Sequence, residues 1–369
     1  MEGSAARSGP FSGTGKATAP GEHPSPGSPD PVRHRLNMAL QGGGTHGAFT
    51  WGVLEALLQD ERIEFHALSG TSAGGINGAL VAQGIVEGGR AGAIAKLEHF
   101  WSAMAAQLAF SPLRNNPLEK LIWGHDLTFS VAWQSFDAVT RILSPYQFNP
   151  LGLEFNPLRE ALEHCIDPAL LHDPRAPELH VTATNVRTGK PKVFSGPEVT
   201  VDALLASACL PNLFQAVEID GEAYWDGGYV ANPALWPLYD RGGPPDIVVV
   251  QVNPLGRIEI PHTVSEILTR VNEISFNASM MSEMRAVDFV QRLVDSGALS
   301  GPKYKRLFVH LIEDEEAMRR YSMSTKYNGD WDFLCELRHR GRMSAGLWLE
   351  KNFDALGRRD SVDVRLRFL

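Results

Sequence analysis

Two consecutive units in the early part of the chain combine an apolar strand, a glycine-rich loop and an apolar helix. Residues 36–40 form a short apolar run that stops at four turn residues, and apolar positions then recur at helical spacing over residues 48–58. The pattern repeats at once, because residues 67–69 lead into a second glycine-rich loop and a helix-like run over residues 76–83. The sequence therefore predicts two successive strand–loop–helix units.

Short apolar runs later in the chain predict further strands that alternate with helices. The run at residues 247–250 is continuously apolar, as is typical of a strand covered on both faces. Such alternation predicts an α/β fold in which a mostly parallel sheet lies between layers of helices. The further strands are expected at residues 178–185, 192–194, 217–219, 247–252 and 306–312, and long helices at residues 264–294 and from residue 331.

Both ends of the chain depart from this alternation. Of the first 31 residues, 21 are Gly, Pro, Ser or Ala, so this segment has too little apolar surface to offset the entropy of ordering it. We therefore predict a disordered tail over residues 1–34. The main domain is expected at residues 35–260, followed by a helical C-terminal extension at residues 261–369.

An aromatic-rich insertion is predicted inside the main domain at residues 100–155. This segment holds ten of the 32 aromatic residues of the chain and is broken by several prolines. One interpretation is an insertion that packs a small core of its own. The other is an apolar wall or lid over a cleft large enough for a lipid.

Composition and charge exclude several classes of protein. The 369 residues are 43 % hydrophobic, which supports a large core and excludes global disorder and fibrous repeats. The net charge of −9 argues against nucleic-acid binding. Three scattered cysteines indicate a reducing, cytoplasmic compartment. No apolar stretch approaches the length of about 18 residues that a membrane span needs, and no signal-peptide pattern is present.

A serine lies in the second glycine-rich loop, between a predicted strand and a predicted helix. Glycines two residues before and two residues after it match the pattern of a nucleophile elbow. Bulky side chains at these positions would clash with the strand and the helix, so the tight turn pushes the serine oxygen out above the sheet edge. The following helix places its positive end at the same point. The predicted elbow comprises Gly70, Thr71, Ser72, Ala73 and Gly74, with Ser72 as nucleophile.

The first glycine-rich loop matches G-x-G-x-x-G over residues 42–47. One interpretation is a dinucleotide-binding loop, with Glu64 as the acid that binds ribose. The elbow follows Glu64 within six residues, however, so the second strand ends in a nucleophile rather than a ribose contact. Glycines also leave backbone N–H groups able to point at the oxygen that becomes negative during acyl transfer. We therefore predict no cofactor and an oxyanion hole made by Gly42, Gly43, Gly44, Thr45 and Gly47.

A serine nucleophile needs a base, and the best candidate is a carboxylate. None of the 12 histidines stands in a segment of recognisable pattern, whereas Asp226 follows an apolar stretch and precedes Gly227 and Gly228. The structural alternative is an Asx turn, which Asp-Gly favours on its own. Taken with the two earlier loops, the Asp-Gly-Gly motif favours Asp226 as the catalytic base, and no metal site is expected.

These three signatures, in this order, resemble the patatin-like phospholipase family. The resemblance covers roughly residues 36–255 and includes the segment at residues 206–211. It implies a three-layer α/β/α fold and a dyad of Ser72 and Asp226, with the oxyanion hole at residues 42–47. It also implies a lipid or fatty-acyl ester as the substrate.

The chain differs from the family pattern in two places. His46 stands where the family usually carries Arg or Lys, which leaves open the role of a fixed cation at the glycine loop. The extension at residues 261–369 resembles one found in some bacterial members, and no activity follows from it.

Two other enzyme classes and one non-catalytic class remain as alternatives. An α/β-hydrolase triad would use His262, His310 or His339 after Asp226, but that fold builds several strands before its elbow. An acyltransferase of the malonyl-transacylase type would pair the serine with histidine, and Thr71 stands where such proteins carry a histidine. A non-catalytic lipid-surface module would not require an intact elbow, aspartate and glycine loop.

We therefore expect a serine lipid acyl hydrolase, that is, a carboxylic ester hydrolase of phospholipase, lysophospholipase or esterase type. Its expected location is cytoplasmic, with peripheral contact with a membrane or lipid surface. No nucleic acid is expected as a partner. The pattern makes no prediction of oligomeric state.

Overall fold

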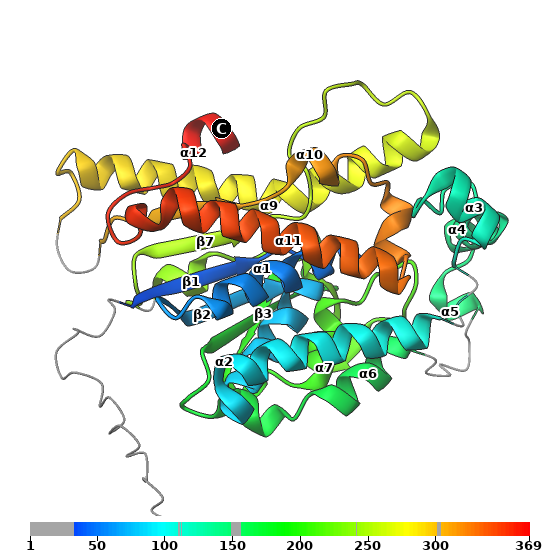
Figure 1. Cartoon of the computed structure of the whole chain (residues 1–369), viewed down its shortest axis with the longest axis horizontal. Helices are drawn as coiled ribbons and strands as arrows, with labels where there is room; N and C mark the ends of the chain where they lie inside the picture. Colours follow the sequence, from blue (N-terminus) through cyan, green and yellow to red (C-terminus); the bar gives the residue numbers. More distant parts are fainter. Residues whose placement is uncertain (1–32, 110, 112, 149–155, 241, 301–303) are drawn as a thin grey trace, which may run out of the picture. The chain divides into compact units, whose positions relative to one another are not determined.

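An eight-stranded sheet lies at the centre of the computed structural model, which describes residues 33–369 apart from residues 110, 112, 149–155, 241 and 301–303 (Figure 1). The strands are β1 (His34–Leu40), β2 (Ile63–Thr71), β3 (Glu178–Asn185), β4 (Pro191–Ser195), β5 (Val217–Ile219), β6 (Glu222–Asp226), β7 (Asp246–Val250) and β8 (Phe308–Ile312). Their order is β5-β6-β3-β2-β1-β7-β8, with β4 paired to β3. The neighbouring pairs among β3, β2, β1, β7 and β8 are parallel, and β4 and β6 pair antiparallel with β3. The expected mostly parallel sheet is confirmed.

Helices connect the strands and cover the sheet. They are α1 (Gly47–Gln59), α2 (Ala73–Leu108), α3 (Pro117–Trp123), α4 (Val131–Ile142), α5 (Pro145–Phe148), α6 (Pro157–Cys165), α7 (Val201–Ser207), α8 (Trp236–Asp240), α9 (Val264–Asp295), α10 (Glu315–Met318), α11 (Trp331–Asn352) and α12 (Val364–Phe368). Short 3₁₀ turns are η1 (Gly44–His46), η2 (Pro168–His172), η3 (Gly196–Glu198), η4 (Gly227–Tyr229), η5 (Met323–Tyr327) and η6 (Phe353–Ala355). Within the described ranges, no helix is apolar over a length that could cross a membrane.

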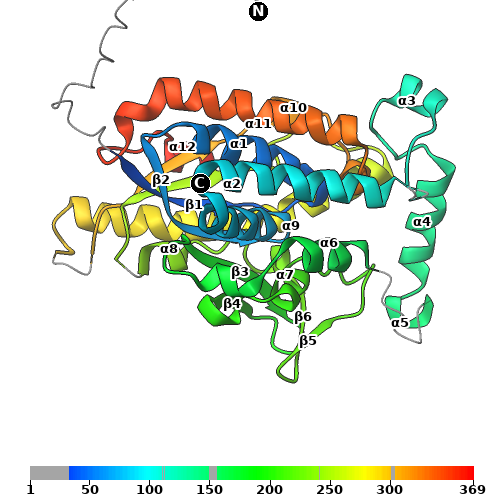
Figure 2. The same cartoon turned by 60° about the horizontal axis from the view of Figure 1, so that its bottom comes forward.

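Side-chain alternation along the strands divides the core into two faces. Leu36, Met38 and Leu40 of β1 pack with α1, α2 and α11, whereas Ala39 and Val249 pack with α8, α9 and α12. This division follows because successive side chains of a strand point to opposite faces of the sheet. Helices α1, α2 and α11 lie side by side in both views (Figures 1 and 2). The expected α/β/α arrangement of three layers is therefore confirmed.

The C-terminal residues complete the sheet and one of its helical layers. Strand β8 pairs with β7 at the edge of the sheet, and α11 crosses α1 so closely that glycine is required at the contact. A Cβ atom at Gly52 would lie 1.9 Å from the carbonyl oxygen of Arg338, and one at Gly341 would lie 2.0 Å from that of Phe49. Residues 33–369 form one compact unit, so the helical extension is part of the same core as the sheet.

The segments expected to be irregular fall partly outside the described residues. Of the predicted tail, residues 1–32 lie outside them, and β1 already begins at His34. In the predicted insertion, α2 continues to Leu108, and α3, α4 and α5 follow. The domain boundaries drawn from the sequence remain predictions.

Candidate active site

The turn between β2 and α2 holds Ser72 in a strained backbone conformation. Its φ of 54° and ψ of −127° lie in a region that side-chain-bearing residues rarely adopt. The turn can be this tight because a Cβ atom at Gly70 would lie 2.5 Å from the backbone of Gly74, and one at Gly74 would lie 2.1 Å from the carbonyl oxygen of Leu40. Thr71, the last residue of β2, donates its hydroxyl to the carbonyl oxygen of Ala231 at 2.8 Å.

Sheet register brings Asp226 next to this turn although about 150 residues separate it from Ser72. One edge of β3 is occupied by β4, which pairs with β3 residues that also pair with β2 or with β6. β2 and β6 therefore both lie along the other edge of β3. Thr71 is opposite Thr182, and Asp226 is opposite the next residue, Ala183. β6 therefore takes over the edge where β2 turns away, and this places the carboxylate of Asp226 at the same cavity as Ser72, near enough for the Ser72 hydroxyl to influence the pKa of the carboxylate.

The carboxylate of Asp226 is almost fully buried, with 1 % of the residue exposed. Burial raises its pKa to about 6, although hydrogen bonds from the Gly228 N–H and the Ser72 hydroxyl and the charge of Lys326 oppose this rise. The N–H of Gly228 donates to Oδ1 of Asp226 at 2.7 Å. This is the contact of an Asx turn, so the turn and the proximity to Ser72 are present together. A Cβ atom at Gly227 would lie 2.1 Å from the carbonyl oxygen of Thr182, which explains the glycine there.

The glycine loop between β1 and α1 lies against the elbow. A Cβ atom at Gly42 would lie 2.8 Å from Cβ of Ser72, and one at Gly47 would lie 2.6 Å from Cβ of Ala73. The N–H of Gly42 donates to Oδ1 of Asn232 at 2.7 Å, so this amide is engaged within the protein. Turn η1 begins without a side-chain cap, and Gly43, Gly44 and Thr45 line a cavity that also reaches Ser72.

That cavity has a volume of about 430 Å³ and mostly apolar walls. Ser72, Ala73 and Asp226 open onto it from the elbow side. Its apolar side chains come from α2, the predicted insertion, the segments around α6 and α7, α9 and η5; they include Ile76, Phe100, Trp101, Met104, Leu108, Leu113, Phe136, Leu158, Leu210, Leu213, Phe214, Phe276, Met323 and Tyr327. A serine in a strained turn, a carboxylate with a raised pKa and an apolar cavity thus meet at one place.

Comparison with known proteins assigns this arrangement to a family. The family model described as patatin-like phospholipase matches residues 38–239, more than half of the chain. This chain belongs to the patatin-like phospholipase family. Membership confirms the family resemblance seen in the sequence and the α/β fold, and it supports lipid acyl hydrolysis as the general activity.

Other comparisons add less. Among solved structures, VipD from Legionella pneumophila is similar over 84% of this chain and 67% of its own chain, with 15% sequence identity and a TM-score of 0.32. A search of curated proteins finds no match. The match to the patatin-like phospholipase model ends before α9 and η5, so the family pattern does not cover those two walls of the cavity.

The histidines considered as alternative bases lie elsewhere in this patatin-like phospholipase. His262 and His339 are exposed, and His310 is buried three strands away from β2, where its ring bonds with Asp246 and Ser361 at 3.0 Å each. No histidine is found among the described residues that line the cavity.

His46 stands where the family usually carries a basic residue. Its side chain is buried and places no positive charge at the glycine loop. Burial and the charge of Lys326 hold the pKa of His46 well below its usual value, so its ring is neutral at neutral pH. Its Nε2 lies 2.8 Å from Oγ1 of Thr325.

Three further polar residues of the site are not predicted from the sequence: Ser207, Asn232 and Lys326. Ser207 accepts the N–H of Ser72 at 2.8 Å and donates to the carbonyl oxygen of Thr182 at 2.6 Å, which ties the elbow to β3. Its signal was the segment at residues 206–211, which resembled the family. Asn232 binds Gly42, and Lys326 lines the cavity from η5; neither stood in a recognisable motif.

Proposed function

We propose that this protein is a serine lipid acyl hydrolase that cleaves carboxylic esters with Ser72 as nucleophile and Asp226 as base. The observation that carries the proposal is the meeting of Ser72 with a buried carboxylate, whose pKa burial raises to about 6, at the wall of an apolar cavity. A base with a pKa near the working pH is both deprotonated and able to take a proton.

The reaction follows from these groups. Asp226 takes the proton of Ser72 as Oγ forms a bond with the ester carbonyl carbon, and the carbonyl oxygen becomes negative. Breakdown of this intermediate breaks the bond to the alcohol, which leaves with the proton from Asp226. Water then attacks the acyl-enzyme with the same base, releasing the fatty acid and restoring Ser72.

Two backbone elements are suited to bind the negative oxygen. Helix α2 and turn η1 both begin at the cavity without a side-chain cap, so their first N–H groups can serve as donors. We infer that the amides of Gly43, Gly44 and Ala73 form the oxyanion hole. Gly42 has a different role in this proposal, since its amide is engaged with Asn232 and its missing side chain makes room for Ser72.

The walls of the cavity support an acyl chain as the bound group. Aliphatic and aromatic side chains such as Met104, Leu108 and Phe136 offer contacts that a fatty-acyl chain can fill, and the polar groups gather at the serine. We infer that the acyl chain lies between α2 and α4, with its ester at Ser72.

Exposed apolar side chains on α3, α4, α5 and the segment between α3 and α4 support contact with a lipid surface. These residues are Leu118, Leu121, Ile122, Phe129, Val131, Ile142 and Tyr146. Since α4 also contributes Phe136 to the cavity, a lipid surface at this place would adjoin the acyl site. All three cysteines are free, which is consistent with the proposed cytoplasmic location.

A fluorophosphonate probe tests the proposal, because it reacts with activated serines. The wild type should be labelled and should hydrolyse p-nitrophenyl esters and defined phospholipids. Ser72→Ala should lose labelling and at least about a thousandfold of activity. Ser102→Ala, on the same helix α2, should keep both, since its hydroxyl bonds only within the helix. Labelling that persists in Ser72→Ala would disprove the assignment of the nucleophile.

A further inference from the structure

Lys326 brings a positive charge to the cavity from the C-terminal extension. Among the described residues that line the cavity, it is the one with a cationic side chain. Its Nζ donates to Oδ1 of Asn253 at 2.8 Å and to Oδ1 of Asn272 at 2.7 Å, and it lies 5.3 Å from the ring centre of Phe276. Both oxygen partners are neutral, so no carboxylate in direct contact cancels the charge of this ammonium ion.

The segment that carries Lys326 packs on the glycine loop. A Cβ atom at Gly44 would lie 2.5 Å from the carbonyl oxygen of Lys326, so glycine is the residue that fits there. Thr45 donates its hydroxyl to the carbonyl oxygen of Thr325 at 2.8 Å. Asn253, which accepts from Lys326, also donates to the carbonyl oxygen of Gly42 at 2.8 Å. The ammonium ion is thus linked to the loop through one amide side chain.

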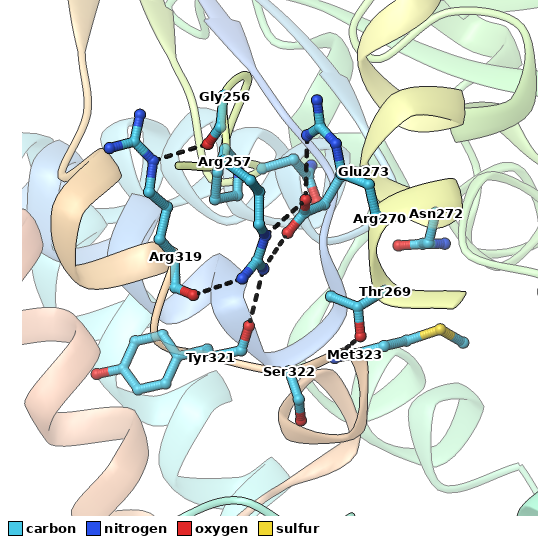
Figure 3. A network of polar contacts seen from close by, with 12 residues as sticks. Gly256, Arg257, Thr269, Arg270, Asn272, Glu273, Arg319, Tyr321, Ser322 and Met323 are labelled. Carbon is cyan, nitrogen blue, oxygen red and sulfur yellow. Dashed lines mark hydrogen bonds and ion pairs between the residues drawn. The ribbon is translucent and has the colours of Figure 1, made fainter. Parts of the chain in front are cut away.

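An ion pair between the partly buried Arg257 and the buried Glu273 fixes this segment against α9 (Figure 3). Arg257 bonds the carboxylate of Glu273 at 2.5 and 3.1 Å and donates to the carbonyl oxygen of Arg319 at 2.7 Å. Close by, the N–H of Met323 donates to the hydroxyl of Thr269 at 3.1 Å. These contacts hold residues 319–323 in place, directly before Lys326.

We propose that Lys326 is a positioning residue of the site, which fixes the glycine loop through Asn253 and brings a positive charge to the cavity that Ser72 and Asp226 also line. The inference rests on the proposed function. It assigns to the C-terminal extension a part in catalysis, and it places the cation of the site on η5.

The charges around Lys326 set the expected pH dependence. Burial lowers the pKa of Lys326 to about 8, with Arg257 acting in the same direction and Glu273 and Asp226 opposing it. The nearby ring of His46 is neutral. In turn, Lys326 lowers the pKa of Asp226. The wild type should therefore be active between an acid limb near pH 6, where Asp226 ionises, and an alkaline limb near pH 8, where Lys326 loses its proton.

The test is the pH profile of kcat/KM on a neutral p-nitrophenyl ester for Lys326→Met, Lys326→Gln and Lys326→Arg. The two neutral variants should lose the alkaline limb, move the acid limb to higher pH and lose about tenfold in kcat/KM at pH 7. Lys326→Arg should move the alkaline limb upward and keep the acid limb near that of the wild type, because arginine stays charged. Lys305→Met is the matched control, since Lys305 is also partly buried but bonds the backbone at Gly243 and Pro244, and it should keep both limbs.

A merely structural role would lower activity without moving either limb, and that result would overturn the inference. If Lys326→Met fails to fold, as judged by circular dichroism and thermal unfolding, Lys326→Gln decides. Suppose that a folded neutral variant keeps both limbs of the pH profile and that the probe still labels Ser72 of the wild type. This result would overturn the role of Lys326 and leave the proposed function standing. A wild type that neither reacts with the fluorophosphonate probe nor cleaves esters would overturn both.

Discussion

The two sides of the cavity are built by different means. The elbow side depends on backbone geometry set by neighbouring residues, with glycines at fixed spacing around Ser72. The other side, made by α9 and η5, depends on side-chain contacts between segments far apart in the sequence, such as those of Lys326 with Asn253 and Asn272. The comparison teaches that the proposed reacting groups stand in local sequence motifs, whereas their meeting and their electrostatic environment are set by tertiary contacts.

The largest effect is expected on the elbow side, from Asp226→Asn. The substitution keeps the shape of the side chain and removes the basic oxygen, so kcat/KM should fall about a thousandfold. The matched control is Asp220→Asn in the exposed turn before β6, a positive-φ position that asparagine tolerates, and it should keep full activity. A near-normal rate for Asp226→Asn would leave Asp226 with only its role in the turn.

Asp226→Asn should also be more stable than the wild type. Its loss of activity would then not result from unfolding. The pKa of Asp226 in the folded protein is about 6, above its ordinary value of 3.8, so the folded state binds this proton more tightly than the unfolded state. Above pH 6 the ionised carboxylate therefore costs stability, and Asp226→Asn removes that cost. Its melting temperature should exceed that of the wild type at pH 7 to 8. The difference should shrink as the pH falls from about 6 to about 4.

The next largest effect tests the side made by α9 and η5 through the buried carboxylate of Glu273, which pairs with Arg257 and Arg270. Glu273→Gln leaves two arginines without their carboxylate, so the free energy of unfolding should fall by about 2 kcal/mol. Glu316→Gln removes the acidic partner of an exposed pair with Arg320 and should change it by less than about 0.5 kcal/mol. Urea unfolding of both variants measures the contrast. Equal changes would mean that the Arg257–Glu273 pair does not hold this side together.

A smaller effect is expected at the apolar wall that joins the two sides. Phe136 lines the cavity, so Phe136→Ala should lower kcat/KM for long-chain esters about tenfold more than for short-chain esters. Trp123 belongs to the same insertion but is partly exposed and contacts Phe129 instead, so Trp123→Ala should leave the ratio unchanged. Equal loss on both chain lengths would assign Phe136 a structural role only.

The smallest effect concerns the outer surface of the insertion. Leu121 is 84% exposed on α3, and Leu121→Ser should weaken sedimentation with phospholipid vesicles by about fivefold while hydrolysis of a soluble ester stays unchanged. Leu366→Ser removes an equally exposed leucine from α12 and should leave vesicle binding unchanged. Identical binding by the two variants would exclude α3 from the lipid contact.

Much of the fold could be predicted because strands and helices have local signals. The apolar run at residues 178–185 forms β3 with the expected bounds, and the long helical pattern from residue 264 forms α9. Strand β6 is not predicted from the sequence, because only three apolar residues lie between Glu222 and Asp226 and it pairs with β3 only where β2 turns away. Its position, and hence the meeting of Asp226 with Ser72, follows from sheet register, which the local sequence does not express.

The same distinction between local signals and tertiary contacts decides which residues of the site could be predicted. Ser72, Asp226 and the glycine loop stand in motifs whose spacing reflects steric needs of a tight turn. Lys326 stands in a 3₁₀ turn without a characteristic pattern, and its contacts with Asn253 and Asn272 join segments 54 to 73 residues apart. Among the aromatic residues at 100–155, Phe100, Trp101 and Phe136 line the cavity, whereas Trp133 contacts the rings of Phe136 and Tyr327.

The late position of η5 in the chain has a consequence for protein synthesis. The elbow leaves the ribosome early, but Met323, Lys326 and Tyr327 of the cavity wall are made more than 200 residues later. Until then the nascent chain carries its serine without a closed acyl site, so it has no enclosed place to hold an ester. On the proposed function, catalytic competence therefore arrives only after η5 has been synthesised and has packed against the elbow.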